Sequence, residues 1–253
     1  MITFEQPLNE RIRTFLRIEQ LFQRLEYCLG GQSVWDTHYA LTTLLEIADL
    51  AARGDLKSEL MKELKRQVAN LERLSAAPGV NSAQLQTIID RHRQLIETLH
   101  GLSGHPGSQM KNNEFLNSIK QRTAIPGGTC DFDLPAYHHW LSQPVEDRHK
   151  FVREWMKPFL TIHEAAGVVL SLIRESATPV KTRAAKGFYQ QNLELGQPYQ
   201  MIRISVSKTS PHFPEISAGK HRFTVRFLQH TNLETRASQT HDNIDFELTC
   251  CSL

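Results

Sequence analysis

The stretch HRFTVRF, residues 221–227, alternates apolar and polar side chains and therefore indicates a β-strand. Successive side chains of an extended chain point to opposite faces, so the two phenylalanines and the valine share one face. Arg222 and Arg226 share the other face with Thr224. The apolar face predicts contact with a buried core, and the polar face carries two fixed positive charges.

The residues on either side of this strand show where the chain changes from helices to strands. Before Pro179, apolar residues recur at spacings of three and four over long stretches joined by short turns, which is typical of a helical bundle. After it, YQMIRISVS (199–207) and NIDFELTCC (243–251) alternate with a period of two, and GFYQQNL (187–193) does so more weakly. The sequence predicts an α+β fold, with an α-helical bundle domain and a smaller antiparallel β-sheet domain.

Helix starts can be placed from residues that cap a helix N-terminus. The candidates are Asn9, Ser33, Asp55, and Asn81 or Ser82. Ser33 is followed by Asp36 at the spacing of a capping box, with Asp in place of Glu. The helix that begins near Pro158 is apolar on more than one side, so we expect it near the centre of the bundle.

The domain boundaries follow from these elements. The segment TCDFDLP (129–135) alternates like a strand and could join the sheet from the middle of the chain. We therefore expect residues 1–116 and 135–178 in the helical domain and residues 117–134 and 179–253 in the β-domain.

Composition is that of an ordinary globular protein, with 40% hydrophobic and 22% charged residues among 253. The sequence contains neither a run of apolar residues long enough for a membrane span nor a signal peptide, which predicts a cytoplasmic protein. Four scattered cysteines are expected to be free thiols. The net charge of +2 argues against a protein that coats nucleic acid, but residues 180–226 hold eight basic and two acidic side chains.

Motifs of enzymes, cofactor sites and metal sites are not found. Adjacent His138 and His139 lack further ligands at a tetrahedral spacing, and His163-Glu164 lacks the second histidine of a zinc-protease helix. IPGGT (125–129) has neither spacing of a phosphate-binding loop, and no GxSxG occurs. We expect no catalysis, no cofactor and no metal.

The arginine-bearing face of the 221–227 strand is the remaining candidate site. Arg222 and Arg226 would stand about 13 Å apart at about 3.3 Å per residue, which suits an extended peptide. Arginine favours planar, bidentate recognition of carboxylates, and Arg203 on the polar face of its own strand could widen the patch. The alternative is a solvated outer sheet face, whose charges only keep the sheet soluble.

Several blocks of the sequence, in one order, resemble the ZapD family of bacterial cell-division proteins. They are PLNERIRTFLRIE at the start, IPGG followed by a cysteine and FDLP, HxW, LIRESA, GFYQ, HRFTVRF and DFELTCC. The resemblance extends from the N-terminus to the C-terminus. It implies a homodimer of two-domain subunits that binds the C-terminal tail of FtsZ at midcell and cross-links FtsZ filaments into bundles at the Z-ring.

The resemblance also implies a basic pocket for that tail. Carried over by motif, its residues are Arg222, Arg226 and Arg53, while Arg17 and His138 match further family positions. In the stretch KNNEFLNSIKQR (111–122), Glu114 stands where a relative is basic, and Lys111 or Lys120 could substitute.

Two other classes of function compete with this prediction. A nucleic-acid-binding module could use the same basic sheet, although the phenylalanines of residues 221–227 point away from the arginines and would not stack on bases. A hydrolase with an unrecognised site is the third hypothesis, and no motif supports it.

Overall fold

The computed structural model describes residues 1–52, 56–75, 81–102, 104, 106–219, 221–232 and 234–253. It divides into two compact units, which we call the β-unit and the helical unit. The β-unit comprises Met1–Thr14 and Leu170–Leu253, and the helical unit comprises Phe15–Val169. Apart from one strand at the N-terminus, the strands follow the helices along the chain and form antiparallel sheets, which confirms the α+β fold class.

The helices follow the predicted periodicity. In chain order they are α1 (Glu10–Leu29), α2 (Val34–Ala52), α3 (Leu56–Leu74), α4 (Ser82–Gly101), α5 (Ser108–Lys111), α6 (Glu114–Thr123), α7 (Pro135–Leu141), α8 (Val145–Met156), the 3₁₀ turn η1 (Lys157–Phe159) and α9 (Leu160–Glu175).

Three of the predicted helix caps are formed. The side chain of Asn9 accepts a hydrogen bond from a backbone N–H in the first turn of α1, at 2.9 Å. Ser33 and Asp36 cap α2 reciprocally: each backbone N–H donates to the other side chain, at 3.0 and 3.1 Å. Asn81 caps α4. The predicted helix start at Asp55 lies outside the described residues.

Helix α9 is a core helix, as its apolar pattern predicts. The stretch Val145–Glu175 is long and apolar enough to cross a membrane by length and composition alone. Within the helical unit, however, its side chains at Ile162 and Val169 are fully buried, and the His163 ring stacks on Phe22 of α1 at 4.1 Å. One face of this helix is therefore buried, whereas Leu160 at its start is 42% exposed.

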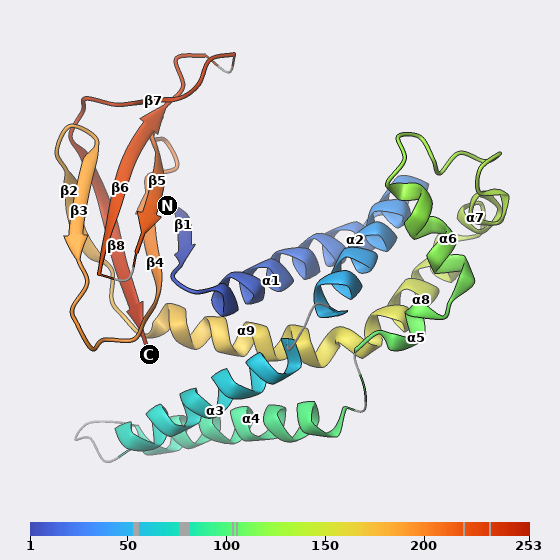
Figure 1. Cartoon of the computed structure of the whole chain (residues 1–253), viewed down its shortest axis with the longest axis horizontal. Coiled ribbons are helices and arrows are strands. Elements are labelled where there is room, and N and C mark those ends of the chain that lie inside the picture. The colour runs from blue at the N-terminus through green and yellow to red at the C-terminus, as the bar shows by residue number, and fades with distance from the viewer. Residues whose placement is uncertain (53–55, 76–80, 103, 105, 220, 233) are drawn as a thin grey trace. The chain divides into compact units, whose positions relative to one another are not determined.

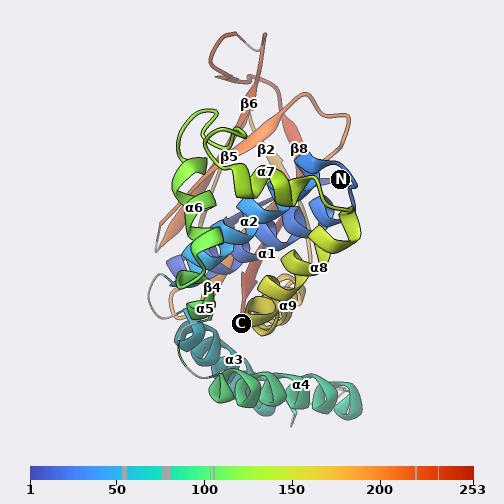
Figure 2. The ribbon, with the colours of Figure 1, turned by 90° about the vertical axis from the view of Figure 1, so that its right-hand side faces the viewer.

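Helices α3 and α4 lie side by side as an antiparallel hairpin in both views (Figures 1 and 2). The interior of the hairpin includes two buried polar side chains, Gln67 and His92, that are hydrogen-bonded to each other at 2.9 Å. Gln67 also donates to the backbone carbonyl of Val169 in α9 at 3.2 Å. The hairpin is thereby hydrogen-bonded to the core helix.

The β-unit contains two antiparallel sheets (Figure 1). Sheet A has the order β1-β4-β8-β2, formed by β1 (Ile2–Pro7), β4 (Tyr199–Val206), β8 (Ile244–Ser252) and β2 (Val180–Ala184). Sheet B has the order β3-β6-β5, formed by β3 (Phe188–Asn192), β6 (Arg222–Gln229) and β5 (Phe213–Ala218), and the short β7 (Ser238–Gln239) also pairs with β6.

The two sheets share one hydrophobic core. Phe223, Val225 and Phe227 of β6 are fully buried, as the alternation predicts. The ring of Phe227 packs against that of Phe246 on β8, with ring centroids 5.1 Å apart. A rigid core therefore holds β6 from its apolar side.

The observed units differ from the expected domain boundaries in three places. Residues 170–178, expected with the helices, lie in the β-unit. Residues 1–14, expected with the helices, lie in the β-unit, where Ile2–Pro7 form β1, because Ile2 and Phe4 alternate with polar residues and pair with β4. Residues 117–134, expected in the β-domain, lie in the helical unit. In place of the strand expected over 129–135, residues 129–133 form turns and a bend, and Pro135 begins α7. Within the described residues, no strand pairs with that segment. Alternation alone, without a hydrogen-bonded neighbour, does not make it a strand.

Candidate functional site

The outer side of β6 carries the predicted positive charges. Arg222 and Arg226 are exposed, whereas the residues between them on the opposite side of the strand are buried. β6 is the central strand of β3-β6-β5, so the flanking strands complete the surface around both arginines (Figure 1). The predicted face is therefore an open, outward-facing part of sheet B.

Strand register shows which residues neighbour the arginines. On β3, Asn192 lies opposite Arg222, Gln190 opposite Thr224, and Phe188 opposite Arg226. On β5, Ser217 lies opposite Thr224 and Glu215 opposite Arg226. We call the outer side chains of these three strands the arginine face: Phe188, Gln190, Asn192, Glu215, Ser217, Arg222, Thr224 and Arg226.

Phe188 belongs to the arginine face but was not predicted as a site residue from the sequence. Its side chain is 42% exposed and lies beside Arg226, so the arginine face has an aromatic ring. The signal was the weak alternation of GFYQQNL, where Phe188, Gln190 and Asn192 share one side. Without the pairing of β3 with β6, that stretch could not be placed beside the arginines.

The two arginines have different electrostatic surroundings. The guanidinium of Arg226 forms a hydrogen-bonded ion pair with Glu215, and both side chains are about half exposed, at 55% and 49%. Arg222 forms no ion pair with any residue in the described ranges. One arginine is thus already paired with a carboxylate, and the other is free to meet one.

Arg203 is on β4 of sheet A, not on the arginine face. Its Nε donates to Glu5 at 3.0 Å, and Glu5 also receives two hydrogen bonds from Arg174, each at 2.8 Å. Burial raises the pKa of Glu5, but the hydrogen bonds and charges of both arginines outweigh it, so the pKa is lowered. Arg203 therefore has an internal partner.

The remaining predicted contacts are on helices or outside the described residues. Arg17 is exposed on α1 and His138 is exposed on α7, both in the helical unit. Arg53 lies outside the described residues. The structure thus brings Arg222 and Arg226 together on one strand, and the roles of the other candidates stay predictions.

His138 lines a hollow of about 360 Å³ in the helical unit. The hollow is lined by Val34, Trp35, His38, Thr129, Cys130, Asp131, Tyr137, His138, Leu141 and Ser142. His38 and Tyr137 are hydrogen-bonded at 2.9 Å, and burial lowers the pKa of His38. His138 thus shares this hollow with aromatic and aliphatic side chains and with polar ones, among them Asp131.

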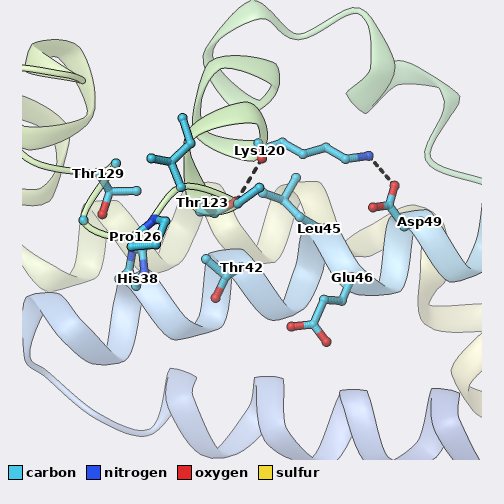
Figure 3. A pocket seen from close by; sticks show the side chains of 13 residues that line it. His38, Thr42, Leu45, Glu46, Asp49, Lys120, Thr123, Pro126 and Thr129 are labelled. Atoms are coloured by element: carbon cyan, nitrogen blue, oxygen red, sulfur yellow. Dashed lines mark hydrogen bonds and ion pairs between the residues drawn. The ribbon is translucent and has the colours of Figure 1, made fainter.

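A larger hollow of about 740 Å³ lies between α2 and the loop after α6 (Figure 3). Its charged groups are already paired: Lys120 contacts Asp49 across the hollow, and Glu46 is 2.5 Å from Arg24. The structure therefore offers an incoming ligand no uncompensated charge among these four side chains.

The IPGG loop beside that hollow is a tight turn. Gly127 has a φ of +69°, and a Cβ at Gly128 would lie 2.5 Å from the carbonyl oxygen of Arg122. The two glycines are thus required by the backbone, which agrees with the prediction of a turn. Within the part of the chain that the structure describes, no three His, Cys, Asp or Glu side chains could share a metal ion.

A family model described as "ZapD: Cell division protein" matches residues 16–226. The chain belongs to the ZapD family of cell division proteins. It is 43% identical over 252 residues to "Cell division protein ZapD" of Methylococcus capsulatus, an alignment that covers 100% of this chain and 98% of that relative. The predicted family resemblance is confirmed.

The ZapD match includes all six predicted contact residues, Arg17, Arg53, His138, Arg203, Arg222 and Arg226. Glu114 is in the first turn of α6, where a carboxylate interacts favourably with the helix dipole. Of the two possible substitutes, Lys120 is paired with Asp49 and Lys111 is exposed.

Proposed function

We infer that this protein is a cell-division adaptor that binds the C-terminal tail of FtsZ through the arginine face. As a homodimer in the cytoplasm, it would cross-link FtsZ filaments and stabilise the Z-ring at midcell. The observation that carries the proposal is the outward pair Arg222 and Arg226, held on one strand by a buried core, in a chain of the ZapD family.

The spacing and chemistry of the arginine pair support an acidic, extended partner. Residues i and i+4 of a strand are separated by about 13 Å, at about 3.3 Å per residue, which suits an extended peptide better than one compact anion. Guanidinium groups bind carboxylates with two parallel hydrogen bonds, which gives direction as well as attraction. Because Arg222 and Arg226 are exposed, binding should weaken as salt concentration rises.

The strand order of sheet B favours a partner peptide that lies across the arginine face over one that pairs with β6 as an added strand. Both edges of β6 are occupied, by β3 on one side and β5 on the other. A peptide that added a strand would pair with an outer edge of β3 or β5 and lie farther from the arginines. We therefore expect side-chain contacts across the outer surface of sheet B.

A homodimer would convert weak tail binding into filament cross-linking. A twofold dimer presents two identical sites from one gene, and a filament presents many tails. Each further contact is then intramolecular, so avidity can exceed the affinity of one site by orders of magnitude.

The test is co-sedimentation with polymerised FtsZ. The double variant Arg222→Glu with Arg226→Glu should lose co-sedimentation and bundling, because carboxylates replace both guanidiniums. The matched control is Lys181→Glu with Arg183→Glu on β2, which changes the charge equally on exposed positions of sheet A. Circular dichroism and the mass by light scattering should be unchanged in both variants.

Retained bundling in the arginine-face variant would reject the site. Equal loss in the β2 control would show that overall charge is responsible. A dimeric mass for the wild-type protein is also required, and a monomer that still bundles filaments would contradict the cross-linking mechanism.

Nucleic-acid binding is the second candidate, because Phe188 provides an exposed ring beside Arg226. Proteins that bind single strands stack successive bases on several aromatic side chains. The arginine face offers one ring, so we expect no shift of single-stranded DNA or RNA in a gel titration at physiological salt. Sequence-independent binding under those conditions would favour this candidate.

A further inference from the structure

Arg222 and Arg226 are on the same face of the same strand, but their neighbours on β5 differ. Glu215 is directly opposite Arg226 and forms an ion pair with it. Near Arg222, the backbone N–H of Gly219 donates to its carbonyl oxygen at 2.9 Å, and glycine has no side chain. The only carboxylate of the arginine face is thus placed against one of the two guanidiniums.

The contact between Arg226 and Glu215 is suited to exchange. Both side chains remain about half exposed, so water and salt can screen the pair. Exposed ion pairs contribute little to folding stability, and another carboxylate can replace Glu215 without leaving a buried charge unpaired. Glu215 therefore occupies the position that a carboxylate of a partner would take at Arg226.

We propose that Glu215 is an internal competitor for Arg226 and sets the affinity of the arginine face for acidic peptides. The proposal rests on the proposed function for the identity of the natural partner, although its chemistry requires only an extended acidic peptide. In the free protein, Arg222 is the first point of contact. Full binding requires a partner carboxylate to displace Glu215 from Arg226.

Removal of this competitor should tighten binding. Glu215→Gln keeps the size of the side chain and removes its charge, so Arg226 becomes free for the partner. We expect the Kd for an acidic peptide to fall about two- to five-fold, the range that corresponds to loss of one exposed ion pair. The decrease of affinity with salt should also become steeper, because binding no longer exchanges one internal pair for an external one.

The measurement is fluorescence anisotropy with two labelled probes, the FtsZ C-terminal tail peptide and hexaglutamate. The matched control is Asp245→Asn on sheet A. Asp245 forms an exposed cross-strand pair with Arg183, at 2.7 and 3.0 Å, so this variant frees an arginine and changes net charge equally. The control should leave both affinities within about two-fold of wild type.

A variant at Arg226 tests the mechanism. If Glu215 acts by occupying Arg226, the gain from Glu215→Gln should disappear in an Arg226→Gln background. A gain that persists there, or an equal gain from Asp245→Asn, would show a general charge effect and overturn the proposal. Circular dichroism of each variant serves as the folding control.

The two probes separate this proposal from the proposed function. Tail binding that Glu215→Gln does not strengthen would overturn the competitor alone. Hexaglutamate binding that the variant strengthens, without any tail binding, would support the competitor and reject the FtsZ assignment. Absence of binding to both probes in every variant would overturn both.

Discussion

Two glutamate–arginine pairs lie in register on neighbouring strands, one pair in each sheet. On sheet A, Glu5 of β1 is opposite Arg203 of β4; on sheet B, Glu215 of β5 is opposite Arg226 of β6. The first pair is joined by Arg174 from α9, and Glu5 is only 18% exposed, against 49% for Glu215. On sheet A the glutamate–arginine contact is largely buried and is part of the fold. On sheet B the same kind of contact is exposed and is available to a partner.

The largest expected difference is in stability. Glu5→Gln should lower the free energy of unfolding by about 2 kcal/mol, because two partly buried guanidiniums lose their shared carboxylate. Glu215→Gln, whose pair is exposed, should change it by less than about 0.5 kcal/mol. Urea denaturation monitored by circular dichroism measures both values.

The critical result is which of these two variants loses more free energy of unfolding. Equal destabilisation would mean that burial does not distinguish the pairs. A large loss from Glu215→Gln would make its ion pair structural and would leave little reason for exchange with a partner.

A pH titration sharpens the same comparison. The pKa of Glu5 is lowered in the folded protein below its ordinary value of 4.5, so the unfolded chain binds more protons as pH falls. Its contribution to stability is therefore present above about pH 4.5 and is lost as pH falls through the folded pKa. Between about pH 5 and pH 3, wild type should lose more stability than Glu5→Gln. Parallel pH profiles for the two proteins would contradict the role of Glu5.

Much of the β-unit could be predicted because alternation is a local signal. The buried side of β6 and the outward arginines both follow from HRFTVRF, and the Asn9 cap of α1 also follows from neighbouring residues. The pairing of Arg203 with Glu5 spans 198 positions in the chain and depends on which strands are neighbours. Periodicity cannot supply that information, so Arg203 was expected on the same patch as the other arginines.

The segment 129–135 shows the opposite error, because its alternating pattern predicted a strand that the structure does not contain. Its alternation is real, but residues 129–133 form turns and a bend within the helical unit, and Pro135 begins α7. A strand requires a hydrogen-bonding neighbour, and the described sheets do not include this segment. The ZapD family was predictable because ordered blocks of sequence carry it, independently of which element each block forms.

The next effect concerns tail binding by Arg222 on β6 and by Arg203 on β4, which are both inner strands of their sheets. Arg222→Gln should weaken binding of the FtsZ tail about five- to ten-fold, because its guanidinium is free of internal ion pairs within the described residues. Arg203→Gln should weaken it less, since Arg203 is committed to Glu5, and should instead lower stability. Anisotropy and urea denaturation of both variants test this, and the reverse order would place Arg203 in the site.

The smallest expected effect concerns Arg203 and Arg226 again. Each lies between a glutamate on one neighbouring strand and a second residue on the other neighbouring strand, and the effect concerns that second residue. On sheet A that neighbour is Thr249, which is buried at 4% exposure, whereas on sheet B it is Phe188, which is 42% exposed. Phe188→Ala should therefore change stability little and weaken tail binding about two-fold, because the ring contributes only part of its surface to a peptide.

The same variant separates peptide from nucleic-acid recognition. Stacking of a base on an aromatic ring contributes about 1–3 kcal/mol, so a protein that used Phe188 for bases would lose about five-fold or more in affinity for single-stranded DNA. A peptide held by carboxylate–guanidinium contacts would lose much less, since its main contacts are the arginines. A Phe188→Ala variant whose tail affinity fell as far as that of Arg222→Gln would show that the ring, rather than the guanidiniums, dominates recognition on the open sheet.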